Sequence, residues 1–397
     1  MKIGVVRFNL TASGGAERYA LNLIGALIER GHEPHVFTAR LPSSFPEGAR
    51  AHLFQAPLRR RNGKSLLPRF LRPRAFRRWL QAELKSSALD LLFVTEPIWP
   101  NDVFRAGGGV HREWLQIVAR ESGGPFAPLK RAWTHLAPFD RAALRDETQL
   151  FQAAHSGLVV CNSEMVAREI TRHYPYPRER IRVVPNGVGQ REFQPATPAA
   201  REALRSERDL QAGDLALLFV GSGLWRKGLD LSIDIVAALR DEMRKRAATL
   251  NVPARRLRFF VVGHGALDAY RKQARALKLE DEVVFVGGLG HGEVLQWYQA
   301  SDIFLFPTRY DPFANACLEA NACGLPVVTT TRNGFSEHIQ NKNGLVLQAP
   351  HDAPSAAREI ADLMENAPSP QTVREALAHL SLENHIALLL DAIQNAK

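Results

Sequence analysis

Short apolar runs, rich in β-branched and aromatic residues, alternate along the chain with longer stretches whose apolar positions recur at helical spacing. Several runs, such as 217–220 and 259–262, are continuously apolar, which is typical of strands buried on both faces of a parallel sheet. In the first half of the chain we expect strands at 3–8, 34–39, 51–55, 91–95, 158–161 and 182–184. In the second half we expect them at 215–221, 257–262, 283–286, 303–306, 326–330 and 345–347.

This alternation predicts βαβ units and therefore an α/β fold built on doubly wound parallel sheets. A chain of 397 residues is too long for one ordinary core, so we expect two such domains that face a cleft. The Pro and Gly residues of 184–188 mark the boundary between them. We place the first domain at 1–187, the second at 188–379, and an amphipathic helix within 380–397.

Composition narrows the class of protein. The chain is 45% hydrophobic and 23% charged, as in a soluble globular protein, and its three cysteines show no paired metal spacing. This cysteine usage favours a reducing compartment. The apolar start is too short for a secretory signal, and no run reaches the roughly 18 apolar residues of a membrane span. We therefore expect a cytoplasmic protein.

The net charge of +10 is concentrated in the first half of the chain. Residues 1–187 contain 28 Lys and Arg against 16 Asp and Glu, whereas residues 188–397 contain 23 against 25. Segment 58–80 alone contains nine basic residues and no acid, with Leu, Phe and Trp interleaved. This composition predicts contact with an anionic membrane surface. A solvated loop is one alternative, and nucleic acid, which we do not expect as a partner, is the other.

Three junctions between a predicted strand and a predicted helix have residues suited to a ligand. Gly14 and Gly15 precede the first helix, where backbone N–H groups and the helix dipole can meet an anion, unless this is a plain tight turn. Arg226 and Lys227 precede another helix, where adjacent cations are unfavourable unless an anion such as a diphosphate compensates. The alternative there is two solvated surface cations. His264, in a glycine turn, is expected to line a base or sugar pocket or else to be structural.

The stretch 308–320 follows a predicted strand and contains Asp311 and Glu319 on either side of an expected helix start. Carboxylates bind the hydroxyl groups of sugars well, often bidentately. Backbone N–H groups at this helix start should be free at the carboxyl ends of the strands, where doubly wound sheets bind ligands. The groups concerned are those of Phe313, Ala314, Asn315 and Ala316. The alternative is a dipole-stabilising acid followed by an exposed helical glutamate.

Taken together, these residues resemble glycosyltransferase family 4, the retaining enzymes with the GT-B fold, in the same motif order over essentially the whole chain. The resemblance implies that Gly14 and Gly15 belong to the glycine loop that faces the donor diphosphate and the acceptor. It implies that Arg226 and Lys227 are the phosphate-binding pair, and that the C-terminal helix packs back on the first domain. Residues 311–319 look like the family's pair of acids.

In that pair the second acid, here Glu319, binds the ribose of the nucleotide. The first, here Asp311, binds donor-sugar hydroxyls. Aspartate is shorter than the family's glutamate by one methylene, or about 1.5 Å, which leaves the identity of the donor sugar open.

Residues 99–115, with the basic segment in the matching place, are similar to the lipopolysaccharide-core glucosyltransferases of this family. These enzymes transfer glucose from UDP-glucose to a core heptose. Asp102 and His111 lie in this stretch, which we expect to be a loop that lines the acceptor side of the cleft. Some relatives have an acidic residue where this chain has Gly108. A catalytic or acceptor-orienting carboxylate is therefore missing here, or Asp102 replaces it.

The resemblance thus implies a retaining hexosyltransferase that moves glucose from a UDP-sugar to a lipopolysaccharide core or similar glycolipid, at the inner face of the bacterial cytoplasmic membrane. No cofactor is expected beyond the nucleotide-sugar donor, and no metal, because the chain lacks a D-x-D motif. Acceptors for capsule, O-antigen or a lipid carrier, with UDP- or GDP-sugars, remain open. So do a sugar-nucleotide hydrolase or epimerase, and a non-catalytic protein recruited to a surface through residues 58–80.

Overall fold

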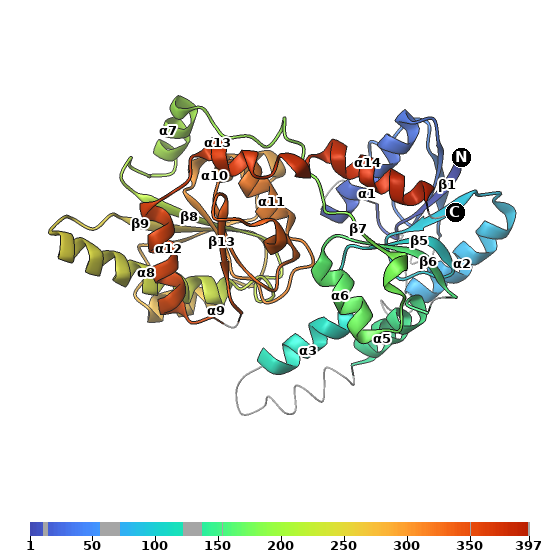
Figure 1. Ribbon diagram of the computed structural model, residues 1–397, viewed down its shortest axis with the longest axis horizontal. Helices are drawn as coiled ribbons and strands as arrows, with labels where there is room; N and C mark the ends of the chain where they lie inside the picture. Colours follow the sequence, from blue (N-terminus) through green and yellow to red (C-terminus); the bar gives the residue numbers. More distant parts are fainter. Residues whose placement is uncertain (11–14, 56–71, 122–136, 153, 350, 396–397) are drawn as a thin grey trace, which may run out of the picture. The chain divides into compact units, whose positions relative to one another are not determined.

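The computed structural model describes residues 1–10, 15–55, 72–121, 137–152, 154–349 and 351–395. The chain divides into two compact units: unit 1 comprises Met1–Pro185 and Ile386–Lys397, and unit 2 comprises Asn186–His385. Each unit is a parallel sheet with helices on both faces (Figure 1). The prediction of an α/β fold with two doubly wound parallel sheets is therefore confirmed.

Unit 1 contains seven strands in the order β3-β2-β1-β4-β5-β6-β7. The strands are β1 (Lys2–Val6), β2 (Glu33–Thr38), β3 (Arg50–Leu53), β4 (Leu91–Val94), β5 (Asn101–Ala106), β6 (Ser156–Cys161) and β7 (Ile181–Val183). The helices are α1 (Gly15–Glu29), α2 (Arg72–Ser86), α3 (His111–Glu121), α5 (Pro138–Leu150), α6 (Glu164–His173) and the 3₁₀ turn η1 (Arg178–Arg180).

The sheet of unit 1 has a separate hydrophobic layer on each face, because successive side chains of a strand point to opposite faces. Ile3 and Val5 of β1 pack with Leu23 of α1 on one face. Val6 packs on the other face with Phe76 of α2 and with apolar residues of α6. Both faces of these strands are thus buried, as their continuous apolar sequence predicts.

The sequence did not predict β5, which pairs with β4 and β6 in the middle of the sheet. Its apolar pattern is interrupted by Asp102 and by Arg105. Arg105 is nonetheless buried, and its guanidinium donates hydrogen bonds to the backbone carbonyls of Cys161 and Val184, at 2.9 and 3.0 Å. The expectation of a loop around Asp102 is therefore wrong, because carbonyl groups of neighbouring chain segments satisfy a cation within the sheet.

The described part of the basic segment 58–80 belongs to α2, and its apolar side chains face the core of unit 1. Phe76 and Leu80 are fully buried, and the Trp79 ring packs against the ring of Phe54. The sequence suggested that these side chains belong to a membrane-facing surface. They cannot form an apolar surface of that kind, because they pack into the core of unit 1. Residues 58–71 lie outside the described residues.

The arginines of α2 divide into two kinds. Arg77 donates a 2.9 Å hydrogen bond to Asp146 and lies over the ring of Trp99, so it is held by the protein. Arg74 and Arg78 are exposed.

Unit 2 contains six strands in the order β10-β9-β8-β11-β12-β13. The strands are β8 (Leu215–Val220), β9 (Leu257–Val262), β10 (Val283–Gly287), β11 (Ile303–Phe306), β12 (Val327–Thr330) and β13 (Gly344–Leu347), each within one residue of its expected bounds. The helices are α7 (Pro198–Ser206), α8 (Leu229–Leu250), α9 (Asp268–Ala276), α10 (His291–Ala300), α11 (Asn315–Ala322), α12 (Ala353–Glu365) and α13 (Pro370–Glu375), with the 3₁₀ turns η2 (Gly334–His338) and η3 (Ala378–Leu380).

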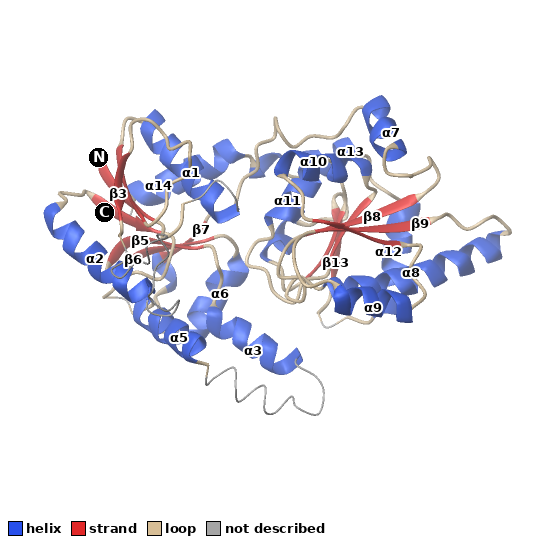
Figure 2. Ribbon diagram, turned by 180° about the vertical axis from the view of Figure 1, so that it is seen from behind, coloured by secondary structure: helices blue, strands red, loops and turns tan. Residues whose placement is uncertain are grey.

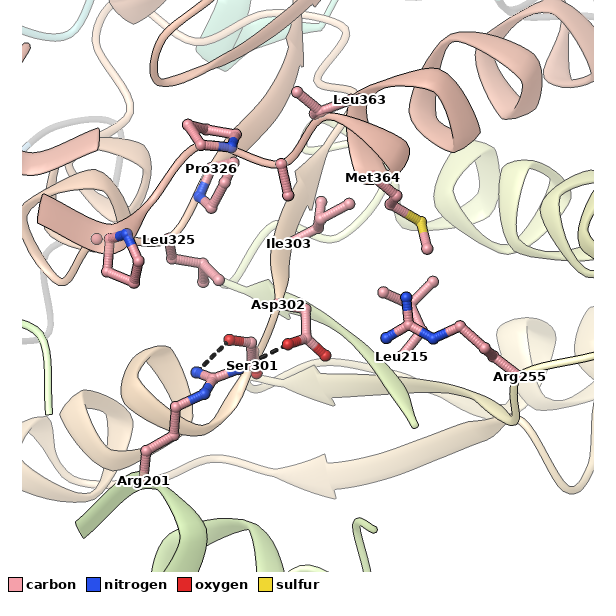
Figure 3. A pocket seen from close by; sticks show the side chains of 14 residues that line it. Arg201, Leu215, Arg255, Ser301, Asp302, Ile303, Leu325, Pro326, Leu363 and Met364 are labelled. Atoms are coloured by element: carbon pink, nitrogen blue, oxygen red, sulfur yellow. Dashed lines mark hydrogen bonds and ion pairs between the residues drawn. The ribbon is translucent and has the colours of Figure 1, made fainter. Parts of the chain in front are cut away.

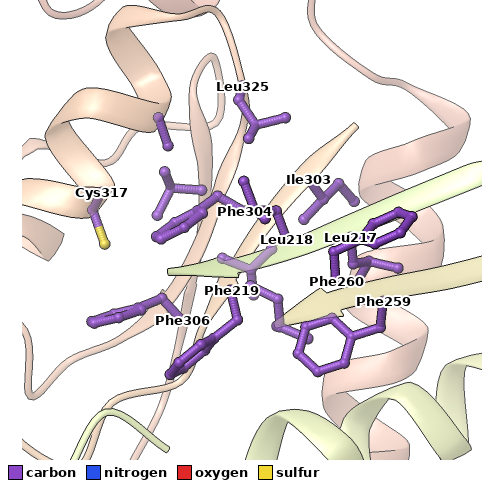
Figure 4. Close-up of a cluster of buried hydrophobic side chains, with 14 of the residues drawn as sticks. Leu217, Leu218, Phe219, Phe259, Phe260, Ile303, Phe304, Phe306, Cys317 and Leu325 are labelled. Atoms are coloured by element: carbon purple, nitrogen blue, oxygen red, sulfur yellow. The ribbon is translucent and has the colours of Figure 1, made fainter. Parts of the chain in front are cut away.

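Helices α8, α9 and α12 cover one face of this sheet, and α10, α11 and α13 cover the other (Figure 2). The core between them is dense in aromatic and aliphatic side chains, including Phe219, Phe259 and Phe306 (Figure 4). Because these strands pair in parallel, their carboxyl ends lie along one edge of the sheet.

The last helix, α14 (Leu382–Gln394), begins in unit 2 and ends in unit 1. Its start is joined to unit 2 by a hydrogen bond from the Leu382 N–H to the Val188 carbonyl, at 3.0 Å. Leu389, Leu390 and Ile393 are buried in the same layer of unit 1 as α1. Within the described part of the chain, no helix is both long and apolar enough to cross a membrane.

Candidate functional site

The order of the strands in unit 2 reverses between β8 and β11, which lie next to each other. From this point the chain winds outward through β9 and β10 on one side and through β12 and β13 on the other. Doubly wound sheets bind ligands at such a switch point, beyond the carboxyl ends of the strands. The turn after β8 carries Arg226 and Lys227, and the segment after β11 carries Asp311. Topology thus brings three predicted site residues to one place.

Both cations converge on one oxygen of Asp311. The Arg226 Nη1 and Lys227 Nζ atoms each lie 3.7 Å from Asp311 Oδ2, which is an ion-pair distance and longer than a direct hydrogen bond. Lys227 Nζ also lies 4.9 Å from the centre of the Phe306 ring. Two cations and one buried carboxylate leave a net charge of +1 at the switch point, which suits an anionic group such as a diphosphate.

Arg309 holds the turn after β8 and the segment after β11 together, and sequence reasoning missed it. Its guanidinium makes two hydrogen bonds of 2.7 Å to the carboxylate of Asp230 and one of 2.8 Å to the Trp225 carbonyl. Its backbone N–H donates to the Arg226 carbonyl at 2.9 Å. This bidentate pairing orients the backbone that carries Arg226 and Lys227.

Two glycines make room for this arrangement. A Cβ at Gly221 would lie 2.6 Å from Cδ of Lys227, so the lysine side chain occupies the space that a side chain at 221 would need. Gly228 has a φ of +77°, and a Cβ there would lie 2.1 Å from the Pro307 carbonyl oxygen. The close approach of the two segments therefore requires glycine at 228, whereas glycine at 221 leaves room for the flexible end of the Lys227 side chain.

Asn333, which the sequence analysis also missed, supports the segment after Asp311. It is fully buried, and its Oδ1 atom accepts hydrogen bonds from the N–H groups of Ala314 and Phe335. The Phe313 N–H donates to Asp311 Oδ1 at 3.3 Å. The expectation that Phe313 and Ala314 offer free N–H groups is therefore wrong, because side chains of the protein accept from both.

Helix α11 begins at Asn315, one residue beyond these occupied groups. The N–H groups of Asn315 and Ala316 open the helix, where no intrahelical acceptor exists, so they remain the candidate donors to an anion. The Asn315 side chain accepts a 2.7 Å hydrogen bond from Asn186.

Glu319 lies on α11, at the same edge of the sheet. It is half-buried, and its Oε2 atom accepts a 3.1 Å hydrogen bond from the hydroxyl of Tyr298. Tyr298 is fully buried, and burial together with the nearby Glu319 carboxylate raises the pKa of its hydroxyl well above the usual value. The tyrosine therefore stays a hydrogen-bond donor that orients Glu319.

His264 follows the carboxyl end of β9 and is exposed. Its ring fills the space beside Gly288, where a Cβ would overlap the imidazole at 1.8 Å. The glycine at 288, after β10, thus allows the histidine to lie along the same sheet edge as Arg226 and Lys227.

In unit 1, His111 is the first residue of α3, beyond the carboxyl end of β5. Its Nε2 atom lies 3.0 Å from Asp140 Oδ1, and its backbone N–H donates to Glu147 Oε1 at 2.7 Å. Glu147 is buried on α5 and also accepts from the Arg112 N–H, so it caps the start of α3. Sequence reasoning missed Asp140 and Glu147, because their partners are about 30 positions away.

The glycine loop of unit 1 is only partly described. Gly15 is the first residue of α1, and Gly14 lies outside the described residues.

Asp102 lies at the opposite edge of the sheet from His111. It is the second residue of β5, near the strand's amino end, and its Oδ2 atom accepts a 2.6 Å hydrogen bond from the Leu92 N–H. The expected catalytic role of Asp102 is therefore not supported, because ligands of such sheets bind beyond the carboxyl ends of the strands.

A pocket of unit 2 lies at the amino ends of its strands, near Leu215 and Ile303 (Figure 3). Its polar groups are engaged by the protein: Arg201 pairs with Asp302 at 2.6 Å and donates to the Ser301 carbonyl. This pocket is on the wrong edge of the sheet to serve the site at the switch point. Within the described ranges, no group of three or more His, Cys, Asp and Glu side chains is arranged to hold a metal ion.

Two doubly wound units, with a cationic site at the switch point of the second, have the architecture of glycosyltransferases of the GT-B type. The sequence profile described as "Glycosyltransferase Family 4" matches residues 13–190, and the one described as "Glycosyl transferases group 1" matches residues 200–379. Together they span most of the chain, which belongs to this family of glycosyltransferases.

Similar proteins agree with this assignment. The chain is 26% identical over 339 residues to "Lipopolysaccharide glucosyltransferase WaaG" of Escherichia coli strain K12, covering 85% of this chain and 82% of that protein. A crystal structure of WaaG, described as involved in lipopolysaccharide biosynthesis, matches with a TM-score of 0.75 at 23% identity, covering 98% and 99% of the two chains. Anabaena HepE in complex with UDP-glucose matches with a TM-score of 0.66 at 16% identity, covering 100% of both chains. These two structural matches show the fold.

Proposed function

We propose that this protein is a retaining glycosyltransferase that moves a hexose, which we take to be glucose, from a UDP-sugar to a lipopolysaccharide-core or similar glycolipid acceptor, without a metal ion. The convergence of Arg226 and Lys227 on Asp311 at the switch point of unit 2 carries the proposal. The name of the E. coli relative, a lipopolysaccharide glucosyltransferase, supports glucose and the acceptor class, and the UDP-glucose complex of the structural neighbour supports a uridine donor.

In this proposal the donor lies along the carboxyl edge of the unit 2 sheet. Arg226, Lys227 and the start of α11 bind the diphosphate, since all three offer positive charge or N–H donors. Glu319, oriented by Tyr298, accepts hydrogen bonds from the ribose hydroxyls. Asp311 accepts hydrogen bonds from the sugar, and His264 lines the nucleoside end of the site.

The transfer breaks the bond between the anomeric carbon and the diphosphate oxygen. The acceptor hydroxyl oxygen forms the new bond from the same face of the sugar, and its proton passes to the departing diphosphate. Negative charge develops on the leaving oxygen, and Arg226 and Lys227 stabilise it there. This route needs no covalent intermediate with the protein.

The anomeric configuration of the product tests the proposal. The protein is incubated with a panel of UDP- and GDP-hexoses and with lipopolysaccharide truncated at its core heptoses, and the product is analysed by NMR. We expect transfer from UDP-glucose with the α configuration retained. A β-linked product would contradict retention, and transfer from GDP-sugars alone would contradict the uridine donor.

Replacement of Lys227 tests whether the cations that converge on Asp311 bind the donor diphosphate. Lys227→Ala should lower turnover about 10²–10³-fold, because loss of a preorganised contact to developing charge costs about 2.7–4 kcal/mol. Lys245→Ala removes an exposed lysine of α8 and serves as the matched control. Near-normal turnover of Lys227→Ala would remove the basis of the proposal.

A further inference from the structure

The sheet of unit 1 has its own switch point, between β1 and β4. From β1 the strand order runs outward through β2 and β3, and from β4 it runs the other way through β5, β6 and β7. Beyond the carboxyl ends of these two strands lie Arg7, which follows β1, and Glu96, which follows β4. The position is the one at which a doubly wound sheet binds a ligand, and the donor site of unit 2 does not use it.

Arg7 lies between two carboxylates at this point. Its Nη2 atom is 3.2 Å from Glu17 Oε1, on the first turn of α1, and its Nη1 atom is 3.8 Å from Glu96 Oε1. The three side chains are partly accessible, at 18%, 18% and 27% for Arg7, Glu17 and Glu96. These three described side chains are one cation and two acids, with a net charge of −1, and the 3.8 Å ion pair of Glu96 is too long to be a direct hydrogen bond.

The environment of Glu96 favours hydrogen bonds from the hydroxyl groups of a ligand to its carboxylate. Burial raises the pKa of its carboxyl group, against the opposing effects of Arg7 and of a backbone hydrogen bond at Phe8. A partly desolvated carboxylate gains more from each hydrogen bond that it accepts than one in water does. The net negative charge also disfavours a phosphate at this position.

We propose that Arg7, Glu17 and Glu96 form a subsite for the polyhydroxyl acceptor sugar, in which Glu96 accepts hydrogen bonds from acceptor hydroxyls and selects a neutral sugar over a phosphorylated one. Glu96 thereby supplies, from the end of β4, a carboxylate that neither Gly108 nor Asp102 provides at this edge. The inference rests on the proposed glycosyl transfer for its ligand class.

The test compares Glu96→Gln with the wild type, using as probe a heptose-terminated core oligosaccharide with and without phosphate on the heptose. We expect the KM for the neutral acceptor to rise at least tenfold, with the calorimetric Kd for UDP unchanged. The preference for the neutral over the phosphorylated acceptor should fall at least tenfold, which a purely structural role would not produce. Glu47→Gln, at an exposed glutamate of unit 1, is the matched control.

Equal KM values and equal acceptor preference in the variant and the wild type would overturn the subsite. Glu17→Gln provides a second variant with the same expected direction, should Glu96→Gln unfold. Saturation-transfer NMR of the oligosaccharide separates this inference from the proposed function, because binding is detected without turnover. Binding by the wild type that Glu96→Gln weakens supports the subsite even if no sugar is transferred; absence of oligosaccharide binding by the wild type overturns it.

Discussion

The two oxygens of Asp311 have different tasks, which explains an aspartate where the family pattern has glutamate. Oδ1 accepts the N–H of Phe313 two residues later, a turn that a short carboxylate side chain makes readily. Oδ2 faces Arg226 and Lys227. A glutamate would extend the carboxylate by about 1.5 Å, too far to close the same turn on its own backbone. The shorter side chain thus ties the site to the start of α11.

A second residue-scale consequence concerns pH. His338 lies in η2. Its ring is near those of Phe335 and of Phe313, which is two residues after Asp311. Burial, with a smaller effect of His379, lowers the pKa of His338 to about 4, below the 6.5 of an unfolded histidine. Between these two values the unfolded chain binds a proton that the folded chain does not. The free energy of unfolding therefore decreases as the pH falls from 6.5 towards 4.

His338→Asn should remove this part of the pH dependence. The wild type is expected to lose up to about 1.4 kcal/mol of unfolding free energy per pH unit in this window relative to the variant. Urea unfolding of both proteins between pH 4.5 and 7.5 provides the measurement. Parallel profiles would show that His338 does not contribute.

At the scale of elements, α2 shows how one helix serves two environments. Phe76 and Leu80 point into unit 1, while Arg74 and Arg78 are exposed. The membrane contact that the sequence predicts for residues 58–80 would therefore rely, within the described part of the segment, on surface charge and not on inserted aromatic rings. Such a contact is electrostatic and should weaken with salt.

The double variant Arg74→Ser/Arg78→Ser tests this contact. Each cation near an anionic surface contributes about 1 kcal/mol, so binding to vesicles rich in phosphatidylglycerol should weaken by roughly tenfold to thirtyfold. Arg244→Ser/Lys245→Ser, which removes two exposed cations of α8, is the control and should bind as the wild type does. Unchanged sedimentation of the α2 variant with the vesicles would refute the contact.

At the scale of the whole molecule, the chain leaves unit 1 after Pro185 and returns to it at Ile386. The returning segment is the second part of α14, whose Leu389 and Leu390 are buried in the layer formed by β1 and α1. The core of unit 1 is thus completed by residues more than 200 positions beyond the end of its main segment, at Pro185, so its stability depends on α14.

Leu389→Ala should lower the stability of unit 1 by roughly 2–5 kcal/mol, because it leaves a cavity in a packed layer. Leu388→Ala is the matched control: this neighbour is 51% exposed, and its replacement should change stability by no more than about 0.5 kcal/mol. Chemical denaturation followed by far-UV circular dichroism measures both. Equal effects of the two substitutions would show that α14 does not contribute to the core.

Much of this architecture is predictable because continuous apolar runs and glycine turns are local signals. The strands of unit 2 are examples, as are the junctions that carry Arg226, Lys227 and Asp311. β5 was not predictable in this way, because Arg105 interrupts its pattern and is satisfied by carbonyl groups far away in sequence. The predicted role of Asp102 failed for the same reason. Its position at the amino end of a strand, away from the edge that binds ligands, follows only once β5 is recognised as a strand.

The sequence by itself determined the fold class, the family resemblance and the residue types of the donor site, since these follow from periodicity and from motifs within a few positions of one another. Only the tertiary structure decided which groups are available. In the folded chain, side-chain oxygens accept hydrogen bonds from the N–H groups of Phe313 and Ala314, and the aromatic rings of α2 are packed in the core. The tertiary structure also gathered Arg7, Glu17 and Glu96 at a switch point. The physical reason is that hydrogen bonds and ion pairs between distant segments depend on sheet order, which no local pattern specifies.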